Sequence, residues 1–132
     1  MKKIIFPLIF IVLILSACSI ISSSSTYILG IEKLNKVPNK VQERIDFNAD
    51  AKLQILETGG SVSYIVYFSN GDVTAYIEKE EDKLIIHLEE TNQQGEALEQ
   101  HVFKLTKDHP DIEYMEVQIN GKPTPFDVSS SV

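Results

Sequence analysis

The sequence predicts an α+β or mainly β domain, in which an antiparallel sheet curls into a sandwich or partial barrel and one short helix lies near the N-terminal end. Three observations predict this class. Beyond residue 51, apolar residues recur at about every second position, as in half-buried strands. Asn-Gly pairs at residues 70–71 and 120–121 are strong hairpin signals. Only residues 37–47 have a helical period.

The first part of the domain combines a strand with this helix. Residues 26–34 alternate, with Tyr27, Leu29 and Ile31 on one side, and predict a short first strand. Pro38 then stands where the start of a helix tolerates proline. The following apolar positions recur every four residues, which predicts a helix of about two turns with one narrow apolar stripe. This stripe is formed by Val37, Val41 and Ile45.

The remaining strands are expected in mostly hairpin order, for about seven or eight strands in all. Residues 62–69 are apolar on both faces, as expected of a central strand, and Asn70-Gly71 should turn them into the next strand as a hairpin. Prolines in residues 122–128 favour an edge strand. The last residues, 129–132, are expected to fray. The expected strands are residues 52–57, 62–69, 72–79, 83–90, 97–105, 112–119 and 122–128.

The N-terminal segment, residues 1–17, has the layout of a secretory signal peptide. It starts with two lysines, continues through an apolar run that is short for a transmembrane helix, and ends in the small residues Ser16 and Ala17. An uncleaved membrane anchor is the alternative interpretation. Both interpretations place the following domain outside the cytoplasm.

The four residues Leu15, Ser16, Ala17 and Cys18 resemble the lipobox of bacterial lipoproteins, with a branched apolar residue three places before the cysteine. This resemblance implies that cleavage follows Ala17, that Cys18 carries a diacylglyceryl group on its sulfur, and that Cys18 becomes the mature N-terminus. The short tether and the Ile- and Lys-rich start favour a Gram-positive bacterium. The remaining sequence looks loosely like compact Bacillus-type lipoproteins without an assigned activity, so no further site residues carry over.

Cys18 is the only cysteine, so the chain has no internal disulfide, and a lipid-modified sulfur cannot act as a nucleophile or metal ligand. Residues 18–26 are Ser-rich and predict a flexible tether of roughly 30 Å at full extension. Residues 27–128 form the single expected domain. Without the signal peptide, ten basic residues face nineteen acidic ones, which argues against nucleic-acid binding and against contact with anionic lipid headgroups. The lipid is therefore expected to hold the protein at the membrane.

Residues 46–57 resemble an EF-hand calcium loop, because carboxylate and amide oxygens fall at its positions 1, 3, 5 and 12. Two departures count against calcium. Ala51 stands where a glycine provides the sharp turn, and Gly59 follows where a second helix should begin. A polar turn stabilised by Asp and Asn side chains is the alternative. The candidate ligands are Asp46, Asn48, Asp50 and Glu57.

A second candidate metal site pairs two histidines. If residues 83–90 and 97–105 form a hairpin centred on residue 94, His87 faces His101 and Glu89 faces Glu99, a set that could hold zinc. A shift of the register by one residue would separate them.

No catalytic or cofactor-binding residues are identified. The sequence lacks a Gly-x-Ser-x-Gly elbow and a phosphate-binding glycine loop, and it lacks the core histidine pattern of a parvulin-like prolyl isomerase. Aromatic residues around Asn70 are candidate partner contacts or cross-strand pairs. These are Tyr64, Tyr67, Phe68 and Tyr76. We therefore expect a non-enzymatic module that binds an envelope or surface protein, with a metal- or small-ligand-binding protein as the alternative and an extracytoplasmic enzyme as the third.

Overall fold

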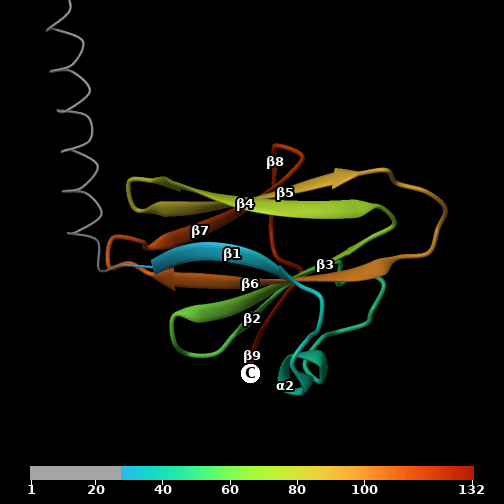
Figure 1. Cartoon of the computed structure of the whole chain (residues 1–132), viewed down its shortest axis with the longest axis horizontal. Helices are drawn as coiled ribbons and strands as arrows, with labels where there is room; N and C mark the ends of the chain where they lie inside the picture. Colours follow the sequence, from blue (N-terminus) through green and yellow to red (C-terminus); the bar gives the residue numbers. More distant parts are fainter. Residues whose placement is uncertain (1–27) are drawn as a thin grey trace, which may run out of the picture.

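The computed structural model describes residues 28–132, and these residues form two packed β-sheets (Figure 1). Sheet A has five strands in the order β1-β6-β3-β2-β9, and sheet B has four in the order β4-β5-β7-β8. This arrangement confirms the mainly β, sandwich-like prediction. In chain order the strands are β1 (Ile28–Leu34), β2 (Leu53–Glu57), β3 (Val62–Ser69), β4 (Asp72–Glu80), β5 (Lys83–Thr91), β6 (Glu99–Asp108), β7 (Tyr114–Ile119), β8 (Lys122–Thr124) and β9 (Val128–Ser131).

The main core lies between the two sheets. Inward side chains alternate along each strand, as the period-two pattern predicts, and sheet B contributes Val73, Leu84, Ile86 and Leu88, each at most 1% exposed. Strand β3 lies between β6 and β2. Its successive residues Ile65 and Val66 point to opposite faces of the sheet and are both fully buried, so the predicted central strand is confirmed. Sheet A contributes Leu53, Ile55, Ile65, Tyr67, Phe103 and Leu105 to this core.

A smaller core covers the outer face of sheet A. The predicted apolar stripe is confirmed, because Val41 and Ile45 are buried against Val66 and Val102 and Val37 packs beside them. The helix itself, α2 (Asn39–Gln42), is a single turn instead of about two. It ends early because the next backbone bonds, from the N–H of Arg44 and Ile45, reach carbonyls only three residues back.

The turn at Asn70-Gly71 was predicted as a hairpin, and this prediction is wrong. Strand β3 pairs with β2 and β6 in sheet A, whereas β4 pairs with β5 in sheet B, so the turn carries the chain from one sheet to the other. Neither residue has the positive φ that a type I′ hairpin turn requires. Gly71 is needed for space, since a Cβ atom there would lie 2.2 Å from the carbonyl oxygen of Thr91.

The second Asn-Gly pair behaves as predicted. Asn120 and Gly121 have φ values of 51° and 81°, and they join β7 to β8 as a two-residue hairpin. Strand β8 covers only the first three residues of the predicted strand 122–128, and it lies at the edge of sheet B, as the prolines of that segment predict.

The C-terminal residues do not fray as expected. Residues 128–131 form β9, which pairs in parallel with β2 at the edge of sheet A. Asp127 fixes the start of this strand, because its side chain accepts a hydrogen bond from the N–H of Leu53 at 3.0 Å and its own N–H donates to the carbonyl of Leu53 at 2.7 Å. A second parallel pair joins β5 to β7, so the sheets are mixed and not purely antiparallel.

Candidate functional site

The residues of the calcium-like motif are spread along the chain. Asp46, Asn48 and Asp50 lie in the loop between α2 and β2, whereas Glu57 is the last residue of β2. Four strand steps separate Glu57 from Leu53, or about 13 Å, so Glu57 does not fold back toward the loop. Within residues 28–132, no group of three or more His, Cys, Asp or Glu side chains is placed to hold a metal ion.

The buried side chain of Gln54 occupies the centre of this loop. Its amide nitrogen donates to the carbonyls of Asp46 at 2.6 Å and Ala51 at 2.8 Å, and its oxygen accepts from the N–H of Asp46 at 3.0 Å. Asp46 also accepts a hydrogen bond from the N–H of Asn48 at 2.9 Å, which is the Asx turn of the alternative interpretation. The side chain of Gln54 thus bonds to backbone groups of the loop and holds the loop in shape, which is the role of the cation in a calcium site.

The predicted pairing of His87 with His101 is wrong. Strands β5 and β6 belong to different sheets, so His87 lies opposite Tyr76 and His101 lies opposite Tyr67. The two carboxylates expected beside them are separated in the same way: Glu89 lies opposite Thr74 on β4 and Glu99 lies opposite Ser69 on β3. The long connection between β5 and β6 crosses between sheets instead of turning back as a hairpin (Figure 1).

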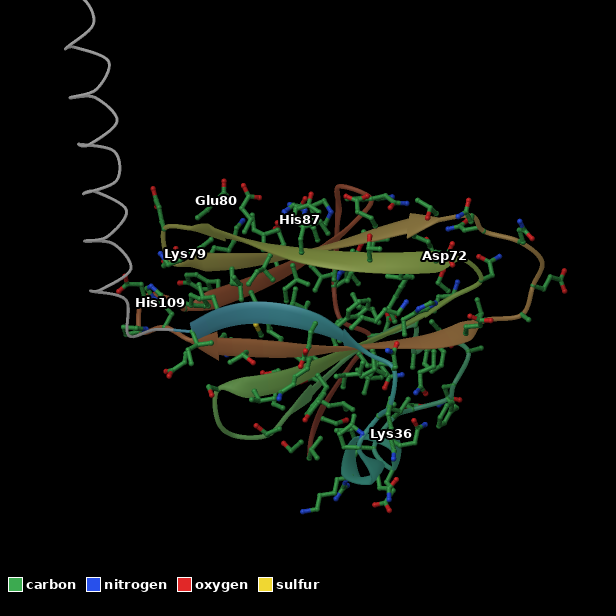
Figure 2. All side chains as sticks on the ribbon, viewed as in Figure 1. Lys36, Asp72, Lys79, Glu80, His87 and His109 are labelled. Carbon is green, nitrogen blue, oxygen red and sulfur yellow. The ribbon has the colours of Figure 1, made fainter. Side chains whose placement is uncertain are left out.

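His87 lies on the outer face of sheet B (Figure 2). Its ring stacks on Tyr76 with centroids 4.4 Å apart, and its Nε2 lies 2.9 Å from a carboxylate oxygen of Glu78. Tyr76 is half exposed, so this stack is a cross-strand pair on an open sheet face.

A polar cluster joins the two sheets at one end of the main core. Glu90 points inward from β5, and one of its carboxylate oxygens accepts hydrogen bonds from the hydroxyl of Tyr67 at 3.2 Å and from the hydroxyl of Ser69. The N–H of Gly71 donates to the same serine oxygen at 3.0 Å. Burial, and then the nearby Glu90 carboxylate, raises the pKa of Tyr67 to about 12.

Lys33 and His101 lie beside this cluster. The ammonium of Lys33 donates to the carbonyl of Val73 at 3.2 Å and lies 3.0 Å from Nδ1 of His101. Nδ1 therefore accepts, and the proton of the neutral ring is on Nε2, which is buried without a well-formed hydrogen bond. Burial and then the Lys33 cation lower the pKa of His101, whereas Glu99, the backbone of Gly71 and Asp72 act in the opposite direction.

This arrangement is suited to holding the sheets together. The cluster does not have the arrangement of a catalytic serine and histidine. Ser69 binds Glu90 and not a histidine, and it is only 1% exposed. His101 contacts Lys33 and not a nucleophile. The cluster is not among the sites predicted from the sequence, although strand alternation contains the signal. Leu84, Ile86 and Leu88 point inward, and the same period places Glu90 inward.

Exposed apolar side chains gather at the end of the sandwich where β6 begins. Phe47 is 66% exposed and Leu98 is 46% exposed, and the ring of Phe47 meets that of Phe68 edge to face at 5.9 Å. We call these three residues the tip patch. They line an apolar hollow of about 150 Å³, together with Asn48, Ala49, Ala51 and Lys52.

The tip patch and Ile28 lie at opposite ends of sheet A. Phe68 pairs with Gln100 near the start of β6, whereas Ile28 pairs with Asp108 at its end. Ten residues of β6 span about 30 Å. Figure 1 shows the same arrangement, with the start of β1 beside the end of β6 and the loop from β5 to β6 at the far side.

The four aromatic residues expected around Asn70 do not share one surface. Tyr67 is buried between the sheets, Tyr64 and Phe68 pack on the smaller core, and Tyr76 lies on the outer face of sheet B. Of these four aromatic residues, only Phe68 belongs to the tip patch.

Comparisons with protein-family models, with curated proteins and with solved structures find no match to this chain. Among residues 28–132, no helix has the length and hydropathy needed to span a bilayer. Cys18 and the rest of the lipobox-like motif lie outside the described residues.

Proposed function

We propose that this chain is a lipid-anchored bacterial envelope protein that binds another envelope protein without catalysing a reaction. The anchor is inferred from the lipobox-like residues Leu15 to Cys18. The observation that carries the binding role is the tip patch. Clusters of exposed apolar side chains around a hollow are typical of protein-protein contact sites, in which aromatic anchors supply most of the binding free energy.

The position of the tip patch supports this role. A tether from Cys18 enters the domain at Ile28, and the tip patch lies about 30 Å away at the other end of β6. An acidic domain is repelled by anionic headgroups, so the lipid supplies the membrane attachment and the far end stays accessible. A partner protein that lies away from the membrane surface can therefore reach Phe47 and Leu98.

The experiment tests anchor and patch separately. Cys18→Ala should abolish labelling with a palmitate analogue and release the protein from the membrane fraction. Crosslinking in intact cells, followed by purification, should recover a partner with the wild type and lose it with the double variant Phe47→Ser, Leu98→Ser.

Ile28→Ser is the matched control, because Ile28 is also an exposed apolar residue, at 59%, but lies at the opposite end. It should recover the partner as the wild type does. The proposed binding role is wrong if the double variant folds and captures the same proteins as the wild type. The proposed anchor is wrong if wild-type protein is unlabelled or fractionates with the cytosol.

A further inference from the structure

Half of β7 lacks a neighbour on one side. Strand β5 pairs with all six residues of β7, from Tyr114 to Ile119, but β8 pairs only with the last three. Tyr114, Met115 and Glu116 therefore form an open edge of sheet B. An unpaired strand edge presents backbone groups that can bind another extended chain.

The hydrogen-bonding direction along β7 identifies the free backbone groups. The N–H groups of Tyr114 and Asn120 point toward the β5 side, where they donate to Asp82 and Leu88. Because this direction alternates along a strand, the odd-numbered residues point to the β8 side. Val117 and Ile119 meet β8 there, whereas the N–H and C=O of Met115 face the open edge.

The segment that follows β8 does not cover this edge. Pro125 follows directly after β8 and has no N–H to donate, and the chain then crosses to sheet A, where Asp127 is held by Leu53. The departure leaves a groove of about 470 Å³ beside Met115. Its lining is mostly apolar and comprises Tyr114, Met115, Val117, Pro123, Pro125 and Phe126, with Lys83, Glu116 and Thr124.

One end of the groove is acidic. A second hollow shares Tyr114 and Lys83 with the groove and is lined further by Glu80, at the end of β4, and by Glu81 and Asp82 of the β4–β5 turn. The ammonium of Lys83 is 3.6 Å from the carboxylate of Glu116, so these opposite charges largely offset each other. The ammonium of Lys79 also lies at this turn, where it donates to the carbonyl of Glu81 at 2.7 Å. Three carboxylates against this one ammonium leave a net negative charge, which favours a cation at this end.

We propose that the open edge of β7 binds an extended, basic segment of a partner protein as an added strand. The backbone of this segment bonds to Met115, an apolar side chain enters the groove, and a Lys or Arg side chain lies at the Glu80–Asp82 turn. Strand addition gives affinity through backbone hydrogen bonds and specificity through alternate side chains. This site is separate from the tip patch and does not depend on the function proposed for it.

The test uses the full chain in detergent and fluorescent ten-residue peptides of alternating Val and Thr. One peptide ends in two lysines, the second ends in two glutamates, and the third is the lysine peptide with alternate amides N-methylated. The lysine peptide should bind at least roughly ten-fold more tightly than the other two, because only it supplies both the cation and the backbone donors. Its binding should also slow hydrogen exchange at the Met115 amide.

Two variants locate the site. Glu81→Lys with Asp82→Lys should remove the preference for lysine over glutamate, and Tyr114→Ser should weaken the lysine peptide by removing part of the groove wall. Phe47→Ser is the control and should bind all three peptides as the wild type does.

Three results would overturn the proposal. Equal binding of all three peptides would exclude strand addition with charge selection. Concentration-dependent dimerisation that protects the Met115 amide without peptide would assign the edge to a second copy of the chain. Protection of this amide in the dilute full chain, lost when residues 19–27 are deleted, would assign it to the chain's own N-terminal segment.

Discussion

Gln54→Met tests whether a buried glutamine, and not a cation, organises the loop from Asp46 to Ala51. Methionine has a similar length and fills the same fully buried space, so the change removes mainly the three hydrogen bonds of the amide. At about 1 kcal/mol for each bond, the free energy of unfolding should fall by about 3 kcal/mol. For a domain of this size such a loss lowers Tm by about 12–24 °C.

The assay is equilibrium urea unfolding at neutral pH, with a thermal melt as a second measurement. Hydrogen exchange at the Asp46 amide should also accelerate, because its acceptor is lost. Gln94→Met is the control, since Gln94 lies exposed in the β5–β6 connection and its substitution should change stability by less than about 0.5 kcal/mol. An equally small effect of Gln54→Met would refute the assignment of the loop to Gln54.

Three further outcomes are expected. Gly71→Ala should destabilise the domain by about 1–3 kcal/mol in urea unfolding because its Cβ would meet the Thr91 carbonyl. Gly60→Ala should not, because its Cβ would make only an ordinary contact with Oγ1 of Thr58 at 3.9 Å, and similar effects of the two changes would contradict the close approach at Gly71. Since burial and Lys33 lower the pKa of His101, the unfolded chain binds a proton that the native state resists, and stability should fall as pH drops below about 6.5. His101→Gln should flatten this pH dependence in urea midpoints, and an unchanged slope would argue against a buried neutral His101. Calcium, zinc and EDTA should each leave Tm unchanged, and a rise with either metal would restore the metal-binding alternative.

Local periodicity was sufficient to predict most strands. The apolar run of residues 62–69 and the alternation along residues 83–90 are both local patterns, and β3 and β5 correspond closely to these ranges. The turn at Asn120-Gly121 was equally predictable, because its two positive φ angles suit Asn and Gly. Strand assignments of this kind need no information about distant residues.

Pairing between strands depends on contacts that local patterns do not contain. Asn70-Gly71 has the composition of a hairpin turn, but the chain passes between the sheets there because Gly71 lies against the distant Thr91 backbone. The predicted His87–His101 pair required β5 and β6 to be neighbours in one sheet, and this error followed from assuming hairpin order. Parallel pairing of β9 with β2 was also out of reach, since these strands are separated by most of the domain.

The inward positions of the charged residues Lys33 and Glu90 follow from the period of their strands. Ile31 packs on the main core, so the period of β1 places Lys33 on the same face, and the period of β5 does the same for Glu90. A charged residue at an inward position signals a partner across the core, because an unpaired buried charge is costly. Here Lys33 donates to the Val73 carbonyl across the core and contacts His101 on the adjacent strand, and Glu90 accepts from Tyr67 and Ser69 across the core.

The open edge of β7 shows how a stabilising contact can create a binding site elsewhere. Pro123 and Pro125 indicate an edge strand, but they do not determine how much of β7 stays uncovered. That extent is set by Asp127, whose two hydrogen bonds to Leu53 draw the chain onto sheet A directly after β8. Because the chain cannot both pair with β2 and continue along β7, the contacts that add β9 to sheet A leave Met115 without a neighbouring strand on the side away from β5.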